Sequence, residues 1–366
     1  MRFITEDAAD LPLRHRFAAP PPPGGEDRPS PRPHRHPGLV PGSTLPRGST
    51  RSLRLHPQPP GGLRERVGSD EGRKGGTTHH PTLANRSIRP ESAGMFDLDA
   101  YLARIGLPAR VTPDAEGLGR LQREHRLAIP FENLDVRLGR GIAIDSASVF
   151  AKLVTAKRGG YCFEHNRLFL DALAALGFDA RPLLARVWLG ATETPPLTHT
   201  FSLVTIDGAD WIADAGFGGS YAPVMALVDG WEVDAPDGAR FRLTRDAAHG
   251  WMLLRKGAAG STDGRGTGEG WQPQYSFYET AVADADLVLS NHWTSTAPSS
   301  RFTQMTIASI VLPHGFAGLT DRRYHRRAGD NDTESEITDP RVYRMRMSLM
   351  FGIDLTADEV AALGLF

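Results

Sequence analysis

The chain has 366 residues, a hydrophobic content of 40% and a formal net charge of -1 at pH 7. This length allows two or three domains, and the hydrophobic content is sufficient for a real core. A single cysteine excludes an internal disulfide framework, and no apolar run reaches the ~18 residues of a membrane span. The first thirty residues carry charges and prolines where a secretory signal would be apolar. We therefore expect a soluble, cytoplasmic protein.

Residues 1–94 differ from the rest in composition. They carry 14 Arg and 1 Lys against 9 acidic residues, a balance of +6, and hold 16 of the 28 prolines. The remainder, with 27 basic and 34 acidic residues, balances at -7. A proline-rich segment without a sustained apolar period cannot bury enough surface to offset its chain entropy, so we expect disorder. It lacks the interleaved aromatic residues of a nucleic-acid stacking surface, and Met95 is the expected true start.

Residues 95–180 show the spacing of a helical domain. Asp97 is placed to cap a first helix, and Thr112-Pro113 is expected to start a second. Ser146 is expected to cap a third helix, which Gly159-Gly160 would end because glycine adopts the left-handed conformation without a Cβ penalty. Residues 129–135 (IPFENLD) are expected to form a packed loop in which Glu132 and Asn133 bond backbone groups.

The only cysteine, Cys162, lies directly behind the two glycines and at the start of a helical pattern that runs to about Leu176. The unpaired N–H groups and the macrodipole at a helix start favour the thiolate, which attacks carbonyl carbon. A lone cysteine is more often a small buried residue without chemistry. Its role therefore depends on the side chains that the fold brings to it.

After Gly177 the apolar period changes to two, which indicates a β domain over residues 181–280. Asp207-Gly208 is a strong signal for a two-residue hairpin turn. If Ile206 pairs with Ala209, Asp214 becomes the diagonal neighbour of His199 on one face, within reach of a hydrogen bond. The alternative is a half-buried histidine that backbone groups satisfy. The expected strands cover residues 181–189, 199–206, 209–215, 240–243 and 251–255.

The remaining segments carry weaker signals. The glycine-rich residues 214–220 lack the lysine and spacing of a P-loop. Residues 257–270 are expected to form a flexible insertion. Residues 281–366 are expected to form an α/β domain, with a helix near 283–291, strands near 303–312 and 342–347, and a last helix with a capping box at Thr356.

Several of these stretches together resemble the arylamine N-acetyltransferase family. Residues 158–166 (RGGYCFEHN) are similar to its active-site signature, and residues 129–135 to its early block. Residues 198–200 and 214–218 resemble the blocks that carry its histidine and aspartate. Residues 291–296 (NHWTST) resemble a block of its third domain. The resemblance extends along almost the whole of residues 95–366.

The resemblance implies an α+β fold with an N-terminal helical bundle, a central β-barrel and a C-terminal α/β lid, related to papain-like and transglutaminase-like cysteine enzymes. It implies a catalytic triad of Cys162, His199 and Asp214. Cys162 would take acetyl from acetyl-CoA and pass it to an aromatic amine, a hydrazine or an N-hydroxyarylamine. No metal, nucleic acid or membrane partner is implied.

Further roles follow from the resemblance. The aromatic residues Phe131, Phe217 and Phe302 would line the acceptor pocket, and Gly216, Phe217 and Gly218 would approach CoA. Arg158 and Glu164 are expected to make structural contacts, because buried charges are usually paired. His165 is turned by about 100° per residue away from Cys162 on a helix and is not the expected base.

Three alternatives stay open. A Cys-His-Asp hydrolase or transglutaminase uses the same three residues with a peptide or glutamine amide as acyl donor. An amide synthase that closes a macrolactam on a carrier-bound polyketide resembles this family and keeps its triad. A non-catalytic CoA-binding or scaffold protein would not need the three residues together. Metal binding is not expected, because the histidines lack paired-ligand spacing and one cysteine cannot form a multi-cysteine zinc site.

Overall fold

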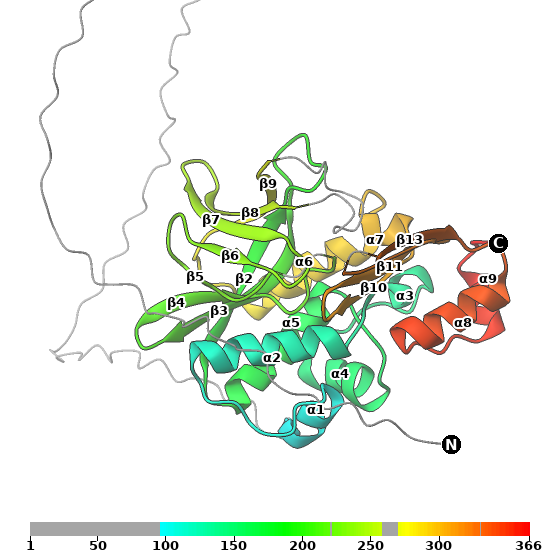
Figure 1. Cartoon of the computed structure of the whole chain (residues 1–366), viewed down its shortest axis with the longest axis horizontal. Helices are drawn as coiled ribbons and strands as arrows, with labels where there is room; N and C mark the ends of the chain where they lie inside the picture. The colour runs from blue at the N-terminus through cyan, green and yellow to red at the C-terminus, as the bar shows by residue number, and fades with distance from the viewer. Residues whose placement is uncertain (1–95, 220–221, 258–269, 330) are drawn as a thin grey trace, which may run out of the picture. The chain divides into compact units, whose positions relative to one another are not determined.

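The computed structural model describes residues 96–219, 222–257, 270–329 and 331–366, which all belong to one compact unit (Figure 1). Residues 1–94, for which disorder and a later start are expected, lie outside the described residues, as do residues 258–269 of the expected insertion. The described part combines helices with two antiparallel sheets, which confirms the α+β class.

Helices make up most of the first part of this unit. They are α1 (Leu98–Arg104), α2 (Ala115–Ala128), α3 (Leu134–Arg137), α4 (Ser146–Phe150), the π-helical turn η1 (Ala151–Thr155) and α5 (Cys162–Ala175). Asp97 caps α1 as predicted and accepts a hydrogen bond from the Ala100 N–H. Two helices begin differently from the prediction, because a nearby aspartate accepts the hydrogen bond at the helix start. Asp114 caps α2 in place of Thr112, and Asp145 caps α4 in place of Ser146.

The predicted helix end at Gly159-Gly160 is wrong. The π-helical turn ends at Thr155, and Lys157 rather than a glycine takes a left-handed conformation, with φ 54°. The two glycines instead permit close approach. A Cβ on Gly159 would lie 2.2 Å from the Pro130 carbonyl oxygen, and one on Gly160 would lie 2.8 Å from a Glu164 carboxylate oxygen. The segment before Cys162 is thereby held tightly against its neighbours.

An eight-stranded antiparallel sheet forms a nearly closed barrel with the strand order β5-β4-β3-β2-β9-β8-β7-β6 (Figure 1). Ile206 pairs with Ala209, so the predicted hairpin register is confirmed. Asp207 and Gly208 both have positive φ, 51° and 77°, as a type I′ turn requires. The strands are β2 (Asp179–Val187), β3 (Leu197–Ile206), β4 (Ala209–Ala213), β5 (Met225–Ala226), β6 (Glu232–Asp234), β7 (Arg240–Asp246), β8 (Gly250–Lys256) and β9 (Gln272–Phe277).

A five-stranded antiparallel sheet makes up the C-terminal part with the flanking helices. Its first strand comes from the early block that was predicted to be a loop. Phe131 in that strand pairs with Ser309. The strands are β1 (Phe131–Glu132), β10 (Ile307–Leu312), β11 (Gly315–Thr320), β12 (Arg323–Ala328) and β13 (Asn331–Glu336), and the helices are α6 (Asp284–Thr296), α7 (Arg301–Gln304), α8 (Pro340–Phe351) and α9 (Ala357–Ala362).

The strand predicted over residues 342–347 is wrong, because this segment lies within helix α8. Asp339 caps the helix, and the buried residues Tyr343, Met347 and Phe351 repeat every four positions. The strand predicted near 303–312 is also shorter than expected, since α7 occupies its first residues. The capping box at Thr356 is confirmed.

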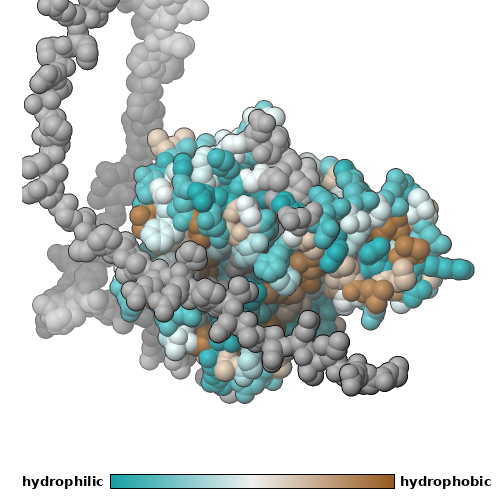
Figure 2. Space-filling model, in the orientation of Figure 1, coloured by the Kyte–Doolittle hydropathy of each residue, from teal (hydrophilic) through white to brown (hydrophobic). Residues whose placement is uncertain are grey.

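Helix α5 lies between the helical part and the barrel. Its buried residues Leu168, Phe169 and Leu173 share one core with residues of α1, α2, β3 and β4. The N-terminal end of α5 belongs to a different apolar cluster, which also contains Ile307 of the second sheet. The first turn of α5 is thus the point where all parts of the unit meet. On the face seen in Figure 2, polar residues dominate and apolar residues gather in a few patches.

Candidate active site

Cys162 is the first residue of α5, as predicted, and only 3% of its surface is exposed. Apolar side chains surround it, among them Phe131, Tyr161 and Leu184. Its thiol donates to the carbonyl oxygen of Thr198, with 3.8 Å between sulfur and oxygen. This contact brings Cys162 to the strand residue that immediately precedes His199.

His199 and Asp214 form a buried hydrogen bond. His199 Nε2 lies 2.7 Å from Asp214 Oδ2, and the two side chains are 2% and 3% exposed. The paired register of β3 and β4 ends at Ser202 and Ala213, so Asp214 directly follows the ladder. The distance agrees with the diagonal pairing that the hairpin turn predicts.

Every polar atom of Asp214 has a partner. Besides His199, its carboxylate accepts from the Gly216 N–H at 3.0 Å and from Asn166 Nδ2 at 3.3 Å. Burial opposes ionisation, but His199, the charge of Arg126 and the Gly216 N–H together hold the pKa of Asp214 below its usual range. The side chain is therefore a carboxylate at neutral pH.

The N–H groups at the helix start act on the Cys162 thiol in the expected direction, but burial has the larger effect on its pKa. Burial raises the pKa of this thiol well above its ordinary value, and the negative charge of Asp214 raises it further. The N–H groups of Cys162 and Phe163 lower the pKa but do not outweigh burial. A thiolate at this position therefore needs a positive charge beside it.

Asn166 is a buried residue of the site to which the sequence analysis assigned no role. It lies one helical turn after Cys162, and its Nδ2 donates to the Cys162 carbonyl at 3.2 Å and to the Thr200 carbonyl at 2.6 Å. Its Oδ1 accepts from the Ala215 N–H at 3.1 Å. Asn166 thus connects the cysteine helix to both segments that carry His199 and Asp214. The i, i+4 spacing from Cys162 was a signal that could have identified it.

The predicted aromatic residues divide into two groups. The rings of Phe131 and Phe302 lie 5.9 Å apart, and the ring of Tyr161 lies 5.4 Å from that of Phe302. Phe217 instead packs edge-on against His199, with 5.0 Å between the ring centroids. The structure therefore brings Phe131 and Phe302 together but places Phe217 beside the imidazole.

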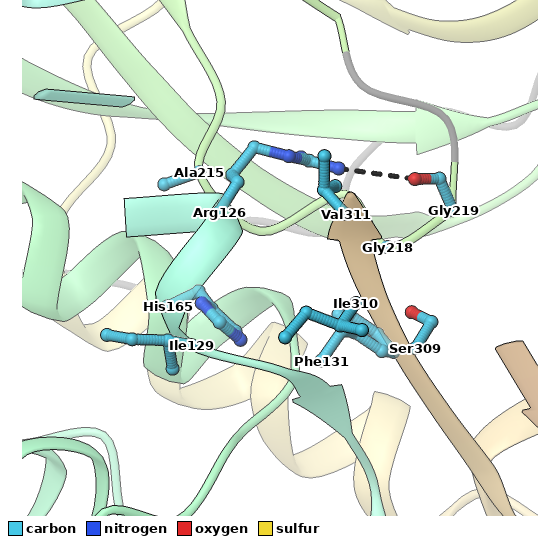
Figure 3. Close-up of a pocket in the computed structure, with 10 residues that line it drawn as sticks. All are labelled: Arg126, Ile129, Phe131, His165, Ala215, Gly218, Gly219, Ser309, Ile310 and Val311. Atoms are coloured by element: carbon cyan, nitrogen blue, oxygen red, sulfur yellow. Dashed lines mark hydrogen bonds between the residues drawn. The ribbon is translucent and has the colours of Figure 1, made fainter. Parts of the chain in front are cut away.

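The glycine segment after Asp214 packs closely against other parts of the site. A Cβ on Gly216 would lie 3.1 Å from the Cys162 Cα, and one on Gly218 would lie 3.0 Å from the Phe131 ring. Gly218 also lines a pocket of about 20 Å³ together with Arg126, Phe131 and strand β10 (Figure 3). That volume has room for about one water molecule.

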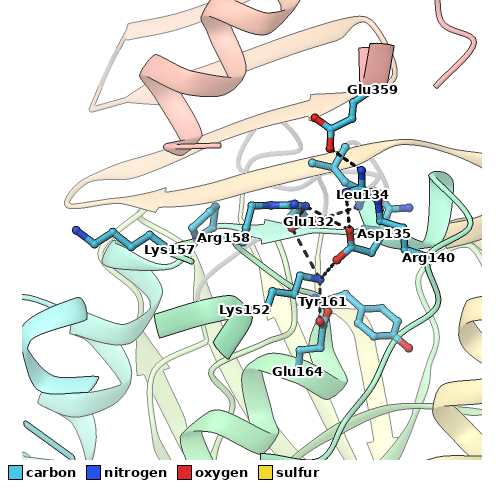
Figure 4. A network of polar contacts seen from close by, with 12 residues as sticks. Glu132, Leu134, Asp135, Arg140, Lys152, Lys157, Arg158, Tyr161, Glu164 and Glu359 are labelled. Atoms are coloured by element: carbon cyan, nitrogen blue, oxygen red, sulfur yellow. Dashed lines mark hydrogen bonds and ion pairs between the residues drawn. The ribbon is translucent and has the colours of Figure 1, made fainter. Parts of the chain in front are cut away.

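A buried network of charges lies next to the helix start (Figure 4). Lys152 Nζ lies 2.7 Å from carboxylate oxygens of both Asp135 and Glu164, and Arg158 lies 2.8 Å from Glu132. Glu164 also accepts from the Tyr161 N–H at 3.0 Å. Arg158 and Glu164 therefore make structural contacts, as expected because buried charges are usually paired.

His165 belongs to a separate chain of buried hydrogen bonds. Tyr101 Oη lies 2.9 Å from His125 Nδ1, His125 Nε2 lies 2.9 Å from His165 Nδ1, and His165 Nε2 lies 3.1 Å from the Pro130 oxygen. Because a carbonyl only accepts, His165 carries its proton on Nε2 and each group donates to the next. Burial lowers the pKa of His165 to about 3. Both histidines are thus neutral.

Within residues 96–366, apart from the undescribed gaps, no group of three or more His, Cys, Asp or Glu side chains is placed to hold a metal ion. None of the helices of this part is both long and apolar enough to cross a bilayer.

Comparison with known proteins identifies the class of the chain. The sequence pattern of the N-acetyltransferase family matches residues 114–360. The arylamine N-acetyltransferase / N-hydroxyarylamine O-acetyltransferase of Salmonella typhimurium is 36% identical over 230 residues, which are 62% of this chain and 77% of that protein. The chain is therefore an acyltransferase. It belongs to the arylamine N-acetyltransferase family.

Solved structures and a further relative agree with this assignment. The Salmonella typhimurium arylamine N-acetyltransferase structure superposes with a TM-score of 0.67 at 32% identity, over 74% of this chain and 98% of that one. The Mycobacterium marinum enzyme, solved in complex with CoA, gives 0.66 at 29% identity, over 73% and 98%. Proansamycin X synthase of Amycolatopsis mediterranei is 30% identical over 268 residues, 71% of this chain and 98% of that protein.

Proposed function

We propose that this protein transfers acetyl from acetyl-CoA to aromatic amines, hydrazines or N-hydroxyarylamines through an acetyl-cysteine at Cys162. The observation that carries the proposal is the buried 2.7 Å hydrogen bond between His199 and Asp214. The residue before His199 in strand β3, Thr198, contacts the Cys162 thiol. We also propose a relationship to papain-like and transglutaminase-like enzymes, in which a cysteine at a helix start lies beside a histidine and an aspartate from a barrel.

The first half-reaction forms the acetyl-enzyme. The Asp214 carboxylate accepts from His199 Nε2–H, so Nδ1 is the nitrogen that takes the proton of Cys162. The Cys162 sulfur then attacks the acetyl carbonyl carbon, and the bond from that carbon to the CoA sulfur breaks. The imidazolium returns its proton to the leaving CoA thiolate.

The second half-reaction reverses these roles. The acceptor nitrogen attacks the acetyl carbon on Cys162, His199 takes the proton that nitrogen loses, and the cysteine sulfur leaves. Asp214 stabilises the imidazolium in both steps, because its carboxylate remains ionised in the buried site. The order of the two steps requires CoA to depart before the acceptor reacts.

The acceptor and the donor are proposed to meet at Cys162. Phe131 and Phe302 supply an aromatic surface beside the cysteine, in the same apolar cluster. Phe217 packs edge-on against the imidazole and is proposed to border the acceptor on the His199 side. The backbone of Gly216, Phe217 and Gly218 is proposed to lie along CoA, since the segment connects the triad with Phe131.

Intact-mass spectrometry tests the function. Incubation with acetyl-CoA is expected to add one acetyl group to the wild-type protein, and an arylamine such as 4-aminosalicylate or a hydrazine such as isoniazid is expected to remove it. Cys162→Ala should gain nothing, because the chain has no other cysteine. Acetylation of the Ala variant at the wild-type rate would contradict the nucleophile assignment.

A second candidate function is macrolactam closure, because Proansamycin X synthase matches this chain over nearly its own whole length. It would use the same triad with a carrier-bound or thioester-linked long chain as donor. A long-chain thioester that bears an internal arylamine distinguishes macrolactam closure from acetyl transfer. Cyclisation of that compound, combined with no transfer from acetyl-CoA, would favour the synthase.

A further inference from the structure

Two side chains on one face of α2 reach the segment that carries Asp214. Gln122 and Arg126 are one helical turn apart and are 0% and 4% exposed. Their side chains therefore point the same way, into the interior. On the same helix, Arg123 is exposed and pairs with its neighbour Glu124.

Gln122 binds backbone groups of Asp214 and Ala222. Its Oε1 accepts from the Asp214 N–H at 2.7 Å, and its Nε2 donates to the Ala222 carbonyl at 2.8 Å. An N–H can only donate and a carbonyl can only accept, so this orientation of the amide is the one that satisfies both.

Arg126 binds two carbonyl groups of this segment. Nη1 donates to the Asp214 carbonyl at 3.2 Å, and Nη2 donates to the Gly219 carbonyl at 3.4 Å (Figure 3). The backbone N–H and C=O of Asp214 are thus both bonded to α2. One guanidinium bridges the two ends of the segment from Asp214 to Gly219.

The segment needs such fixed points because of its composition. It contains Gly216, Gly218 and Gly219, and the last two have positive φ of 71° and 78°. Glycine loses more conformational freedom on folding than any other residue, so a segment rich in it is easily displaced. A small displacement of Asp214 would lengthen its bond to His199, and catalytic geometry is sensitive to shifts of about 1 Å.

We propose that Gln122 and Arg126 are positioning residues for acetyl transfer, which fix the Asp214 carboxylate against His199 by holding its backbone from α2. The proposal rests on the function proposed above for Cys162, His199 and Asp214. It adds a role for the guanidinium charge, which favours the ionised form of Asp214. The other ionisable groups that face Asp214 are His199 from β3, Cys162 from α5 and Tyr275 from β9.

The test compares Arg126→Gln, Arg126→Lys and Gln122→Met with the matched control Arg123→Gln. The first readout is the single-turnover rate constant for acetylation at saturating acetyl-CoA. In Arg126→Gln and Gln122→Met this rate constant is expected to fall about tenfold or more, which corresponds to a loss of about 1.4 kcal/mol of transition-state stabilisation. Arg126→Lys keeps the charge but cannot bridge two carbonyls, so an intermediate rate is expected. The control should match wild type.

The second readout is alkylation of Cys162 by iodoacetamide as a function of pH, which does not involve acetyl-CoA. Arg126→Gln is expected to move the acid limb of this profile to higher pH, and Arg126→Lys to restore it. If wild type forms no acetyl-enzyme, the proposed function fails, while this shift still reports the effect of the Arg126 charge on Asp214.

Wild-type rates and pH profiles in Arg126→Gln and Gln122→Met, with only a lowered thermal midpoint, would overturn the proposal. If Arg126→Gln does not fold, Arg126→Lys decides, because a wild-type rate in that variant shows that the bridge is not needed.

Discussion

Cys162 must ionise among apolar side chains if it is the nucleophile. Burial and the Asp214 charge both raise the pKa of its thiol, and the helix start offsets only part of this. The proton must therefore move to a group whose positive charge stays beside the sulfur. We propose that His199 is this group, because the neighbouring Thr198 contacts the Cys162 thiol and His199 Nε2 bonds to a carboxylate. We expect the thiolate and the imidazolium to form as a pair.

Asp214→Asn tests this coupling, since it keeps the size of the side chain and removes its charge. Two effects oppose each other: the carboxylate repels a thiolate directly, and it stabilises the imidazolium that favours one. The second acts across a 2.7 Å hydrogen bond, so we expect it to dominate. The Asn variant should alkylate with iodoacetamide at a higher pH midpoint than wild type, and acetylation should fall far more than CoA binding.

Asp210→Asn, in the strand β4 that precedes Asp214, is the matched control, because Asp210 bonds to Thr205 rather than to His199. An unchanged alkylation profile for Asp214→Asn would reduce the proposed triad to a pair. A midpoint below that of wild type would show that direct repulsion is the larger effect.

Gly216→Ala tests how closely the glycine segment must approach α5. The added Cβ would lie 2.8 Å from Asn166 Nδ2 and from the His165 Cβ, distances that force a shift. We expect the free energy of unfolding to fall by about 1–3 kcal/mol, which is typical of overpacking. The acetylation rate should fall by a larger factor than the fraction of folded protein.

Gly119→Ala on α2 is the control, because its Cβ would meet only a Val224 methyl group at 3.4 Å. This substitution should raise stability by about 0.5–1 kcal/mol, the usual gain for alanine within a helix. Turnover should not change. Equal turnover in both variants would show that the approach of Gly216 is irrelevant to the reaction.

At the scale of elements, local signals predicted the parts of the site that lie close in sequence. The Asp207-Gly208 turn fixes the β3–β4 register, and with it the reach from His199 to Asp214. The start of α5 at Cys162 follows from the helical period. In both cases the information is contained within about twenty residues of chain.

Other features depend on partners far away in sequence. β1 forms because Phe131 pairs with Ser309, and no local pattern indicates that pairing. Gly159 serves a close approach to Pro130 rather than a helix end, which only the tertiary structure reveals. Likewise, Gln122 and Arg126 look like ordinary helix residues until their partners near Asp214 are known.

Glu164 gives the start of α5 a dependence on pH. Burial raises its pKa to about 7, against the partial compensation of Lys152. In the unfolded chain the Glu164 carboxyl loses its proton near its ordinary pKa of 4.5, whereas in the folded state it keeps the proton to higher pH. Stability from this group is present below pH 4.5 and is lost as pH rises toward 7.

Glu164→Gln should remove this dependence, because Gln keeps an acceptor for the Tyr161 N–H and cannot ionise. Urea unfolding at pH 5 and pH 8 is the measurement. From pH 5 to pH 8, the free energy of unfolding of the Gln variant should rise by up to about 3 kcal/mol relative to that of wild type. A relative loss at pH 8 would show that the ion pair with Lys152 outweighs burial. Glu124→Gln, at an exposed ion pair, should show no such trend.

At the scale of the whole described unit, its parts are joined at a few buried polar residues. Asn133 donates from Nδ2 to the carbonyls of Phe302 and Met305 at 2.8 and 2.7 Å, and its Oδ1 accepts from the Ile307 N–H at 2.7 Å. One side chain near the helical part therefore binds the backbone on both sides of the turn into β10. The start of α3, which Asn133 precedes, is thus held to the start of the second sheet's strand β10.

The last prediction concerns residues 1–94. A chain that begins at Met95 is expected to fold and to keep full acetyl transfer, because the apolar core starts at Leu98 and the triad lies within residues 162–214. Its turnover and urea midpoint should match those of the full chain.

The control is a chain that begins at Leu107 and therefore lacks α1. It removes Leu98, Leu102 and Tyr101 from the core, and with Tyr101 the hydroxyl that bonds to His125. Loss of such buried side chains costs several kcal/mol, so this shorter chain should be unstable or inactive. A drop of more than about tenfold in the rate constant of the Met95 chain, about 1.4 kcal/mol of transition-state stabilisation, would show that residues 1–94 contribute to the reaction.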